Sequence, residues 1–166
     1  SLLGLTLEQL TAVFQEMGEP GFRAKQVMEW VFKRRVLGFD QMTNLGAALR
    51  AKLAERFTLR TMTYSTVTGS EDTTRKYLFK LHDGRYVETV LIPANPALYG
   101  GASDRLTLCV SSQVGCAYDC KFCASGLAGF TRNLTPGEIV EQIVQVEALA
   151  QDRIDNLVFM GMGEPM

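Results

Sequence analysis

The chain has 166 residues, 46% of them hydrophobic and 21% charged, with a formal net charge of -1. This length predicts one domain or two small ones, and the composition excludes an intrinsically disordered chain. The balanced charge predicts no overall attraction to nucleic acid or membrane. No apolar run is long enough to span a bilayer, so we expect a soluble, cytoplasmic protein with reduced thiols and no membrane partner.

Residues 1–58 predict a small helical domain. Apolar side chains recur at helical spacing from Leu10 to Met17, from Val27 to Val31 and from Leu45 to Leu53. Thr6 is a candidate N-cap residue for the first helix. Residues 19–60 contain nine Lys and Arg but only four Asp and Glu. This local excess indicates either a phosphate-facing patch or an ordinary solvated helical surface.

Residues 59–103 predict a strand-rich linker segment. We expect strands over 60–68, 75–81 and 85–93, where Thr, Tyr and Val are frequent. The tripeptide His-Asp-Gly between the last two predicts a tight hairpin turn, with His82 as a turn residue and not a metal ligand. Residues 95–103 read as a loop and as the best candidate domain boundary.

Residues 104–166 predict one strand–helix–strand unit. A strand over 105–112 precedes a cysteine-containing loop, a helix over 135–150 and a buried strand over 156–161. Thr135, Pro136 and Glu138 form a helix start signal with a capping box, and we expect Ile139, Ile143, Val146 and Leu149 to form the apolar face. Such a unit implies a parallel sheet, so the fold class is α/β with an α+β N-terminal part.

Three of the four cysteines, Cys116, Cys120 and Cys123, lie within eight positions with the spacing C-x3-C-x2-C. Clustered thiolates bind soft metals. A structural zinc would need a fourth ligand, and Cys109 in the preceding strand is the available thiol. Incidental packing of three thiols on one loop is the weakest alternative. An iron–sulfur cluster held by three thiolates would keep one iron open to an external ligand.

The spacing, with Phe122 just before the last cysteine, resembles the signature of the radical S-adenosylmethionine (SAM) superfamily. There the open iron of a 4Fe-4S cluster chelates SAM. The segment GMGEP, residues 161–165, resembles the glycine-rich motif that binds the amino group of the SAM methionine. Glycine permits a close backbone approach, and the resemblance assigns Gly163 and Glu164 to this contact.

A more specific resemblance covers nearly the whole chain. The stretch CVSSQVGCAYDCKFCASGLAGFTRNLTPGEI, residues 109–139, closely resembles the RlmN/Cfr-like dual-specificity RNA adenine-C2 methyltransferases. Residues 74–93 resemble the hairpin of that family. Residues 21–32 resemble part of its accessory RNA-binding domain. The resemblance implies the start of a radical SAM partial (β/α)6 barrel from residue 104 onward.

The family resemblance implies a reaction that uses two SAM molecules. One methylates a carrier cysteine, and the other provides the radical that activates the new methyl group for addition to C2 of an adenine. The resemblance assigns Glu88 as the proton acceptor and Cys109 as the resolving thiol, which forms a transient disulfide with the carrier. Without it, Glu88 would read as an edge-strand acid and Cys109 as a packed strand residue. We also expect Glu88 to be desolvated beside Tyr86, Val90 and Ile92.

Two departures from the family limit these expectations. Thr73 replaces a glycine of the family motif. The chain ends at Met166, and none of its four cysteines is left to serve as the carrier, so we expect a truncated barrel and a fragment inactive alone. Open sheet edges would favour dimerisation.

The implied partners are 23S ribosomal RNA, transfer RNA as a second substrate, and an external electron donor. The rival hypotheses are a non-catalytic RNA-binding module with a four-cysteine zinc site, and another radical SAM reaction such as methylthiolation.

Overall fold

The computed structural model describes residues 1–69, 74–94, 104–118, 120–127 and 129–165. The chain divides into two compact units, Ser1–Thr61 with Pro136–Leu149 and Met62–Thr135 with Ala150–Met166. The expected α/β class is confirmed. The division at residues 58 and 103 stays a prediction, and the expected loop over 95–103, like Thr73, lies outside the described residues.

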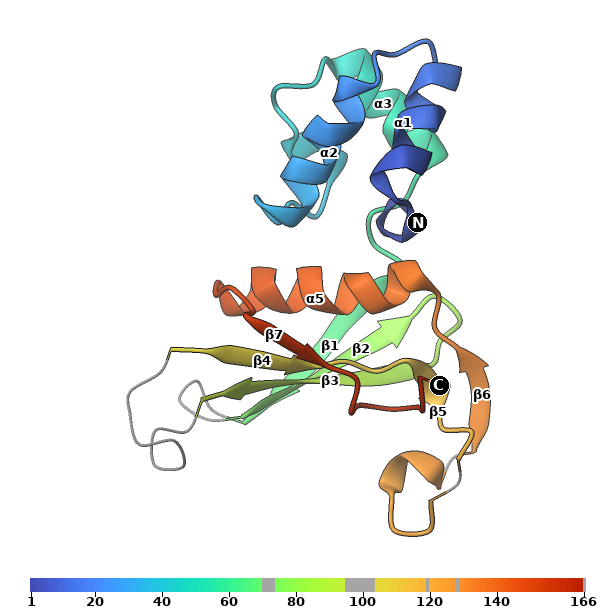
Figure 1. Ribbon diagram of the computed structural model, residues 1–166, viewed down its shortest axis with the longest axis vertical. Helices are drawn as coiled ribbons and strands as arrows, with labels where there is room; N and C mark the ends of the chain where they lie inside the picture. The colour runs from blue at the N-terminus through green and yellow to red at the C-terminus, as the bar shows by residue number, and fades with distance from the viewer. Residues whose placement is uncertain (70–73, 95–103, 119, 128, 166) are drawn as a thin grey trace. The chain divides into compact units, whose positions relative to one another are not determined.

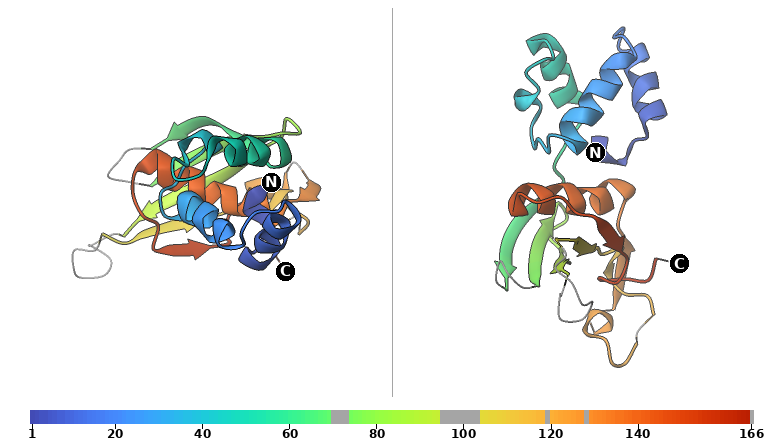
Figure 2. Two further views of the ribbon diagram at one scale, coloured as in Figure 1. Left: turned by 90° about the horizontal axis from the view of Figure 1, so that it is seen from above. Right: turned by 60° about the vertical axis from the view of Figure 1, so that its left-hand side comes forward.

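The first unit is helical (Figures 1 and 2). Its helices are α1 (Leu7–Glu16), α2 (Phe22–Phe32), α3 (Ala47–Arg56) and α5 (Pro136–Ala150), with the 3-10 turns η1 (Leu2–Gly4) and η2 (Phe39–Gln41). The N-cap prediction is confirmed: the Gln9 amide donates to the Thr6 hydroxyl over 3.2 Å, and the Gln9 side chain accepts from the Thr6 amide over 2.9 Å. Within the described ranges, no helix is both long and apolar enough to cross a membrane.

The core of this unit is apolar and continuous. Its fully buried members include Leu10, Phe14, Val27, Met42 and Leu53. Each such side chain contributes about 1.5–3 kcal/mol on burial. The helical pattern from Leu45 to Leu53 is corrected at its start. Leu45 is buried but precedes α3, because the extended backbone at Gly46 (ψ 147°) begins the helix only at Ala47.

Helix α5 begins and ends as predicted, but its buried face differs. The sequence predicted a face of Ile139, Ile143, Val146 and Leu149. Of these, Val146 is buried and Leu149 is exposed, whereas Glu141 and Gln145 are buried. Glu141 accepts from the Thr61 amide and hydroxyl over 2.6–2.9 Å and from the Gln145 amide over 2.8 Å. These hydrogen bonds allow a carboxylate to be buried at a position that periodicity left outside the apolar face.

The second unit is built on a five-stranded sheet in the order β1-β2-β3-β4-β7 (Figure 1). Its strands are β1 (Met62–Thr68), β2 (Arg75–Leu81), β3 (Tyr86–Pro93), β4 (Leu106–Cys109) and β7 (Asn156–Val158). The first four pair antiparallel, and β4 pairs with β7 in parallel. The connection from β4 to β7 contains α5, which confirms the predicted strand–helix–strand unit. A second, two-stranded sheet pairs β5 (Gln113–Gly115) with β6 (Phe130–Asn133).

The hairpin of β2 and β3 forms as predicted, with His82 in its turn and Gly84 at a positive φ of 83°. Asp83 of this turn accepts from the Arg132 guanidinium on β6 over 2.8 Å and from the Arg85 amide over 3.1 Å. Desolvation pushes the pKa of Asp83 upward, but these hydrogen bonds outweigh it and lower the pKa. The turn is therefore tied to the second sheet by a charged pair.

Two strand predictions are corrected. The strand over 105–112 ends at Cys109, because the amides of Ser112 and Gln113 both donate to the Met162 carbonyl, over 2.9 and 3.1 Å, and leave the ladder of the main sheet. The strand over 156–161 is shorter and not of the buried type: Leu157 and Met160 are exposed. Among the described strands, β7 is at the edge of the sheet and pairs on one side only.

Candidate functional site

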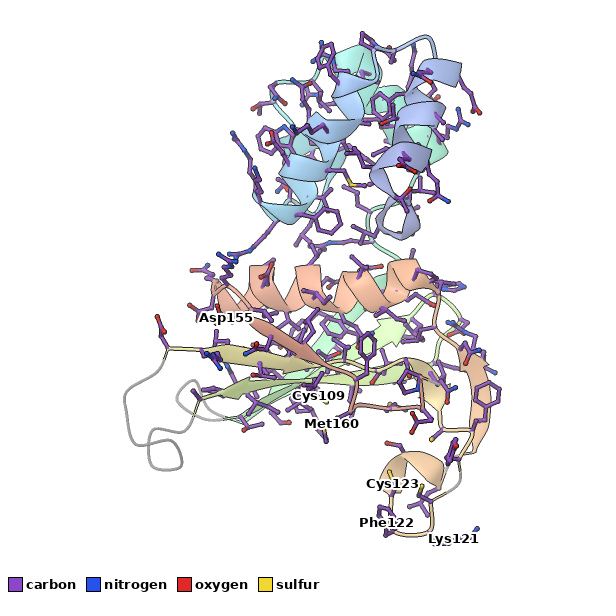
Figure 3. The ribbon with its side chains drawn as sticks, viewed as in Figure 1. Cys109, Lys121, Phe122, Cys123, Asp155 and Met160 are labelled. Atoms are coloured by element: carbon purple, nitrogen blue, oxygen red, sulfur yellow. The ribbon has the colours of Figure 1, made fainter. Side chains whose placement is uncertain are left out.

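The cysteine motif lies on a loop between β5 and β6, which Figure 3 shows projecting from the sheet. Gly115 ends β5 at a φ of 76°, and a Cβ atom there would lie 1.7 Å from the carbonyl oxygen of Gly129. Only glycine fits this close crossing. The Cys116 amide donates to the same carbonyl over 3.3 Å, closing the neck of the loop. The crossing therefore groups the three predicted ligands on one closed segment.

The three loop cysteines are free thiols that are partly exposed. Cys123 precedes the 3-10 turn η3 (Ala124–Gly126). Hydrogen bonds from the Ser125 amide and hydroxyl, together with one from the Gly126 amide, lower the pKa of Cys123 against a smaller opposing effect of desolvation. The thiolate is the metal-binding form of cysteine, so this turn favours a ligand. Phe122, the aromatic residue of the motif, is 94% exposed.

The donor set fits an iron–sulfur cluster better than a four-cysteine zinc site. Figure 3 shows Cys109 within the sheet and Cys123 on the projecting loop, so the fourth zinc ligand would come from a separate part of the unit. In the described part of the chain, no three His, Cys, Asp or Glu residues are already grouped to hold a metal ion. Three thiols on one closed loop suit the chemistry of a cluster, and binding would have to gather them.

Cys109 ends β4 and is only 6% exposed. Burial raises the pKa of its thiol, and a hydrogen bond from the Met160 backbone offsets this only in part. Cys109 is therefore held as a neutral thiol. Its partner across the β3–β4 ladder is Val90, so its side chain lies on the same face of the sheet as Glu88, two residues before Val90.

The expectation that Glu88 is desolvated is wrong. Its side chain is 42% exposed and forms an ion pair with Lys76 of β2, with Nζ 2.9 Å from Oε1. On β3, the alternate residues Val87, Thr89 and Leu91 are the buried ones. Strand alternation places Glu88 on the opposite, more open face, together with Tyr86 and Ile92.

The GMGEP segment follows β7 and packs against the residues just after β4. A Cβ atom at Gly161 would lie 2.8 Å from the Ser111 hydroxyl oxygen, and one at Gly163 would lie 2.5 Å from Cβ of Gln113. The Ser111 hydroxyl donates to the Glu88 carbonyl over 2.5 Å and accepts from the Met162 amide over 2.9 Å. Both glycines are thus required by packing within the chain itself.

Sequence reasoning missed Ser111 and Gln113. Both are buried polar residues of the stretch CVSSQVGC. This stretch formed part of the family resemblance, but no role was assigned to Ser111 or Gln113 from the sequence. The available signal was a run of three polar residues, Ser-Ser-Gln, between two valines in a segment expected to be a strand. Buried polar side chains need hydrogen-bond partners, and here those partners are the segments that carry the predicted site.

The chain is similar to known RNA methyltransferases. Residues 1–59 match the family of ribosomal RNA large subunit methyltransferase N-terminal domains. Over 161 residues, the chain is 55% identical to a probable dual-specificity RNA methyltransferase RlmN of Akkermansia muciniphila, covering 97% of this chain and 45% of that protein. A protein of the same description from Porphyromonas gingivalis is 48% identical, with coverage of 99% and 46%.

A solved structure shares the fold as well. A radical SAM methyltransferase from Sphaerobacter thermophilus superposes with a TM-score of 0.88 at 41% identity, covering 99% of this chain and 47% of that one. The chain corresponds to the N-terminal part of RlmN-family proteins. It spans less than half the length of these RlmN-type relatives.

Proposed function

We propose that this chain is the N-terminal part of a radical SAM methyltransferase that places a methyl group on C2 of an adenosine in 23S ribosomal RNA, with transfer RNA as a second substrate. The names of the relatives support the methyltransferase class and the RNA substrate. One observation in the structure carries the proposal. The cysteine loop, closed at Gly129, and the GMGEP segment, which begins at Gly161, are 32 or more residues apart in sequence. Both are nevertheless hydrogen-bonded to the short stretch from Ser111 to Gln113.

The cofactor contacts follow from these two segments. Cys116, Cys120 and Cys123 would hold the 4Fe-4S cluster through their thiolates. Gly163 and Glu164 would receive the methionine end of SAM, with the Glu164 carboxylate paired to its ammonium. When bound, the cluster and SAM supply the radical chemistry.

The residues of the sheet perform the remaining steps. Glu88 takes up the proton released from C2 of the adenine, and its exposed position on β3 gives the RNA access to the carboxylate. Lys76 pairs with that carboxylate, with its Nζ 2.9 Å from Oε1. Cys109 acts as the resolving thiol: as a thiolate it attacks the carrier sulfur and forms a disulfide with it, the bond from that sulfur to the RNA-bound carbon breaks, and this carbon keeps the electron pair and takes up a proton to become the methyl group. The buried, neutral state of Cys109 protects it from side reactions until then.

Two requirements of the proposed reaction, a carrier cysteine and a source of electrons, are not met by the four cysteines of this chain. The carrier cysteine is not among them, because each has another role, so we expect no turnover by this chain alone. The electrons come from an external donor. Dimerisation through β7 is the expected fate of the exposed edge in the isolated chain.

The helical unit is proposed as the RNA-binding accessory part. Of its basic residues, Arg23 lies over the ring of Phe22 at 5.1 Å and Arg34 over the ring of Trp30 at 4.2 Å. Arginine stacked on an aromatic ring presents a flat cation, which suits contacts to phosphates and bases.

A panel of cysteine variants tests the cluster assignment. Each cysteine is replaced by serine in turn, and each purified chain is reconstituted anaerobically with iron and sulfide. We expect Cys116→Ser, Cys120→Ser and Cys123→Ser to lose most of the bound iron, and the matched variant Cys109→Ser to keep it. Equal loss in all four variants, together with tight binding of one zinc ion by the unaltered chain, would contradict the proposal.

A further inference from the structure

The side chain of Gln113 joins the two segments of the proposed cofactor site. Gln113 begins β5 and is 7% exposed. Its amide oxygen accepts from the backbone N–H of Ala117, the residue after Cys116, over 3.2 Å. The same oxygen accepts from the backbone N–H of Glu164, also over 3.2 Å. One atom is therefore shared by the start of the cysteine loop and the end of the GMGEP segment.

The other half of the Gln113 amide fixes its orientation. Its nitrogen donates to the side-chain oxygen of Asn133 over 2.9 Å, and Asn133 pairs with Gln113 across the β5–β6 ladder. A carboxamide has one accepting and one donating end, so the bond to Asn133 turns the oxygen toward the two loops.

The backbone around Gln113 adds a second connection to the same segment. Its N–H donates to the Met162 carbonyl over 3.1 Å. Gly163, at a φ of 101°, passes so close that a Cβ atom there would lie 2.5 Å from Cβ and 2.6 Å from Cγ of Gln113. The GMGEP segment is thus seated directly on Gln113, and a shift of this side chain would move Glu164.

We propose that Gln113 is a positioning residue, which uses its shared amide oxygen to hold Glu164 at a set place relative to the cysteine loop. This inference rests on the proposed function, because it concerns the placement of the SAM-binding carboxylate relative to the first cluster thiol. Gln113 itself does not contact the reacting atoms. Its role is to couple two loops, the one that would hold the cluster and the one that would hold the methionine end of SAM.

Amide hydrogen exchange tests the coupling without any cofactor. In Gln113→Met, which keeps the length of the side chain and removes its hydrogen bonds, the amides of Ala117 and Glu164 should both exchange at least about fivefold faster. The matched control is Gln145→Met at a glutamine of α5 that is also buried, and this substitution should leave both rates unchanged. An unchanged rate at either amide in Gln113→Met would overturn the inference.

The variant Gln113→Glu separates positioning from a general structural role. A carboxylate oxygen can still accept from both amides, so both should stay protected within about threefold of the unaltered chain. This rescue decides the matter even if Gln113→Met fails to fold. Loss of protection at either amide in Gln113→Glu would contradict the shared-oxygen clamp.

A SAM titration of the reconstituted chains then tests the consequence for the site. We expect Gln113→Met to keep its iron content and to need at least about tenfold more SAM for a half-maximal change in the EPR spectrum, since Glu164 is no longer held. Equal SAM affinity in the two chains would overturn the positioning role. Failure of the unaltered chain to take up a cluster would overturn the proposed function instead, and the exchange rates would still decide the coupling.

Discussion

The core of the helical unit and the anchor of the proposed cofactor site are both buried, but they are held by different forces. Around Phe14, the helical unit is held together by the packing of apolar side chains. Around Gln113, the sheet unit is held together by hydrogen bonds that join Ser111 and Gln113 to the backbone of Met162 and Glu164. Apolar packing is non-directional and sets stability, whereas hydrogen bonds are directional and set geometry. The two regions should therefore respond differently to substitution.

The largest expected loss of stability is in the helical core. Phe14→Ala removes a fully buried ring and should lower the free energy of unfolding by about 3–5 kcal/mol. Urea denaturation followed by the fluorescence of Trp30, the single tryptophan, reports on this unit. The control Phe22→Ala removes a ring that is 59% exposed and should cost less than about 1 kcal/mol. Equal losses would mean that the ring of Phe14 does not belong to a packed core.

Alanine substitutions at two glycines separate the cost of backbone strain from the cost of steric overlap with a neighbouring side chain. Gly163 and Gly84 both have positive φ, but only at Gly163 would a Cβ atom meet another residue closer than 4 Å. Gly84→Ala should cost about 1–2 kcal/mol from strain alone. Gly163→Ala should cost about 1–3 kcal/mol more, because the new methyl group overlaps Gln113. Thermal denaturation and the exchange rate of the Glu164 amide measure both effects, and similar behaviour of the two variants would contradict the packing described.

A smaller, pH-dependent effect is expected at the charged pair of Asp83 and Arg132. Asp83→Asn should lower stability by about 0.5–1 kcal/mol at pH 7, since the pair is near the surface. Because the folded-state pKa of Asp83 is lowered, this contribution is present above the ordinary aspartate pKa of about 3.9 and is lost as the pH falls through the folded value.

Urea denaturation at pH 7 and at pH 3 checks the sign of this dependence. The difference between Asp83→Asn and the unaltered chain should shrink at the lower pH, and the exposed control Asp152→Asn should show little difference at either. A difference that grew on acidification would contradict a lowered pKa at Asp83.

The smallest effect is expected at the half-exposed pair of Lys76 and Glu88. Lys76→Met should change the free energy of unfolding by no more than about 0.5 kcal/mol, because solvent screens the pair and ordering two side chains offsets the attraction. Thermal denaturation alongside Glu88→Gln measures it. A decrease in the free energy of unfolding above about 2 kcal/mol, on the scale expected of a buried pair, would mean that the pair is buried. It would then support the expectation that Glu88 is desolvated, which the structure contradicts.

Local features of the sequence were predictable because their causes lie within a few residues. Asp83 and Gly84 determine the hairpin turn, and Thr6 with Gln9 forms a capping box. The cluster chemistry of the cysteine loop, inferred from three thiols at fixed spacing, stays a prediction. In each case the interacting groups are close in sequence, so a pattern in the sequence records the structure.

Long-range contacts were not predictable. The end of β4 at Cys109 depends on the Met162 carbonyl, and the role of Gln113 depends on the Glu164 amide, 51 residues away. The buried Glu141 on α5 depends on Thr61, 80 residues away. Periodicity predicted a strand that continues past Cys109 and left Glu141 outside the apolar face of α5, and tertiary hydrogen bonds overrode both expectations.

The proposed open iron site is tested most directly by EPR spectroscopy of the chain, reconstituted anaerobically with iron and sulfide, reduced, and recorded with and without SAM. The account predicts a reduced 4Fe-4S signal that changes on addition of SAM, because three loop thiolates keep one iron free for the cofactor. A chain that takes up no cluster and binds one zinc ion tightly would contradict the account and favour a structural metal site.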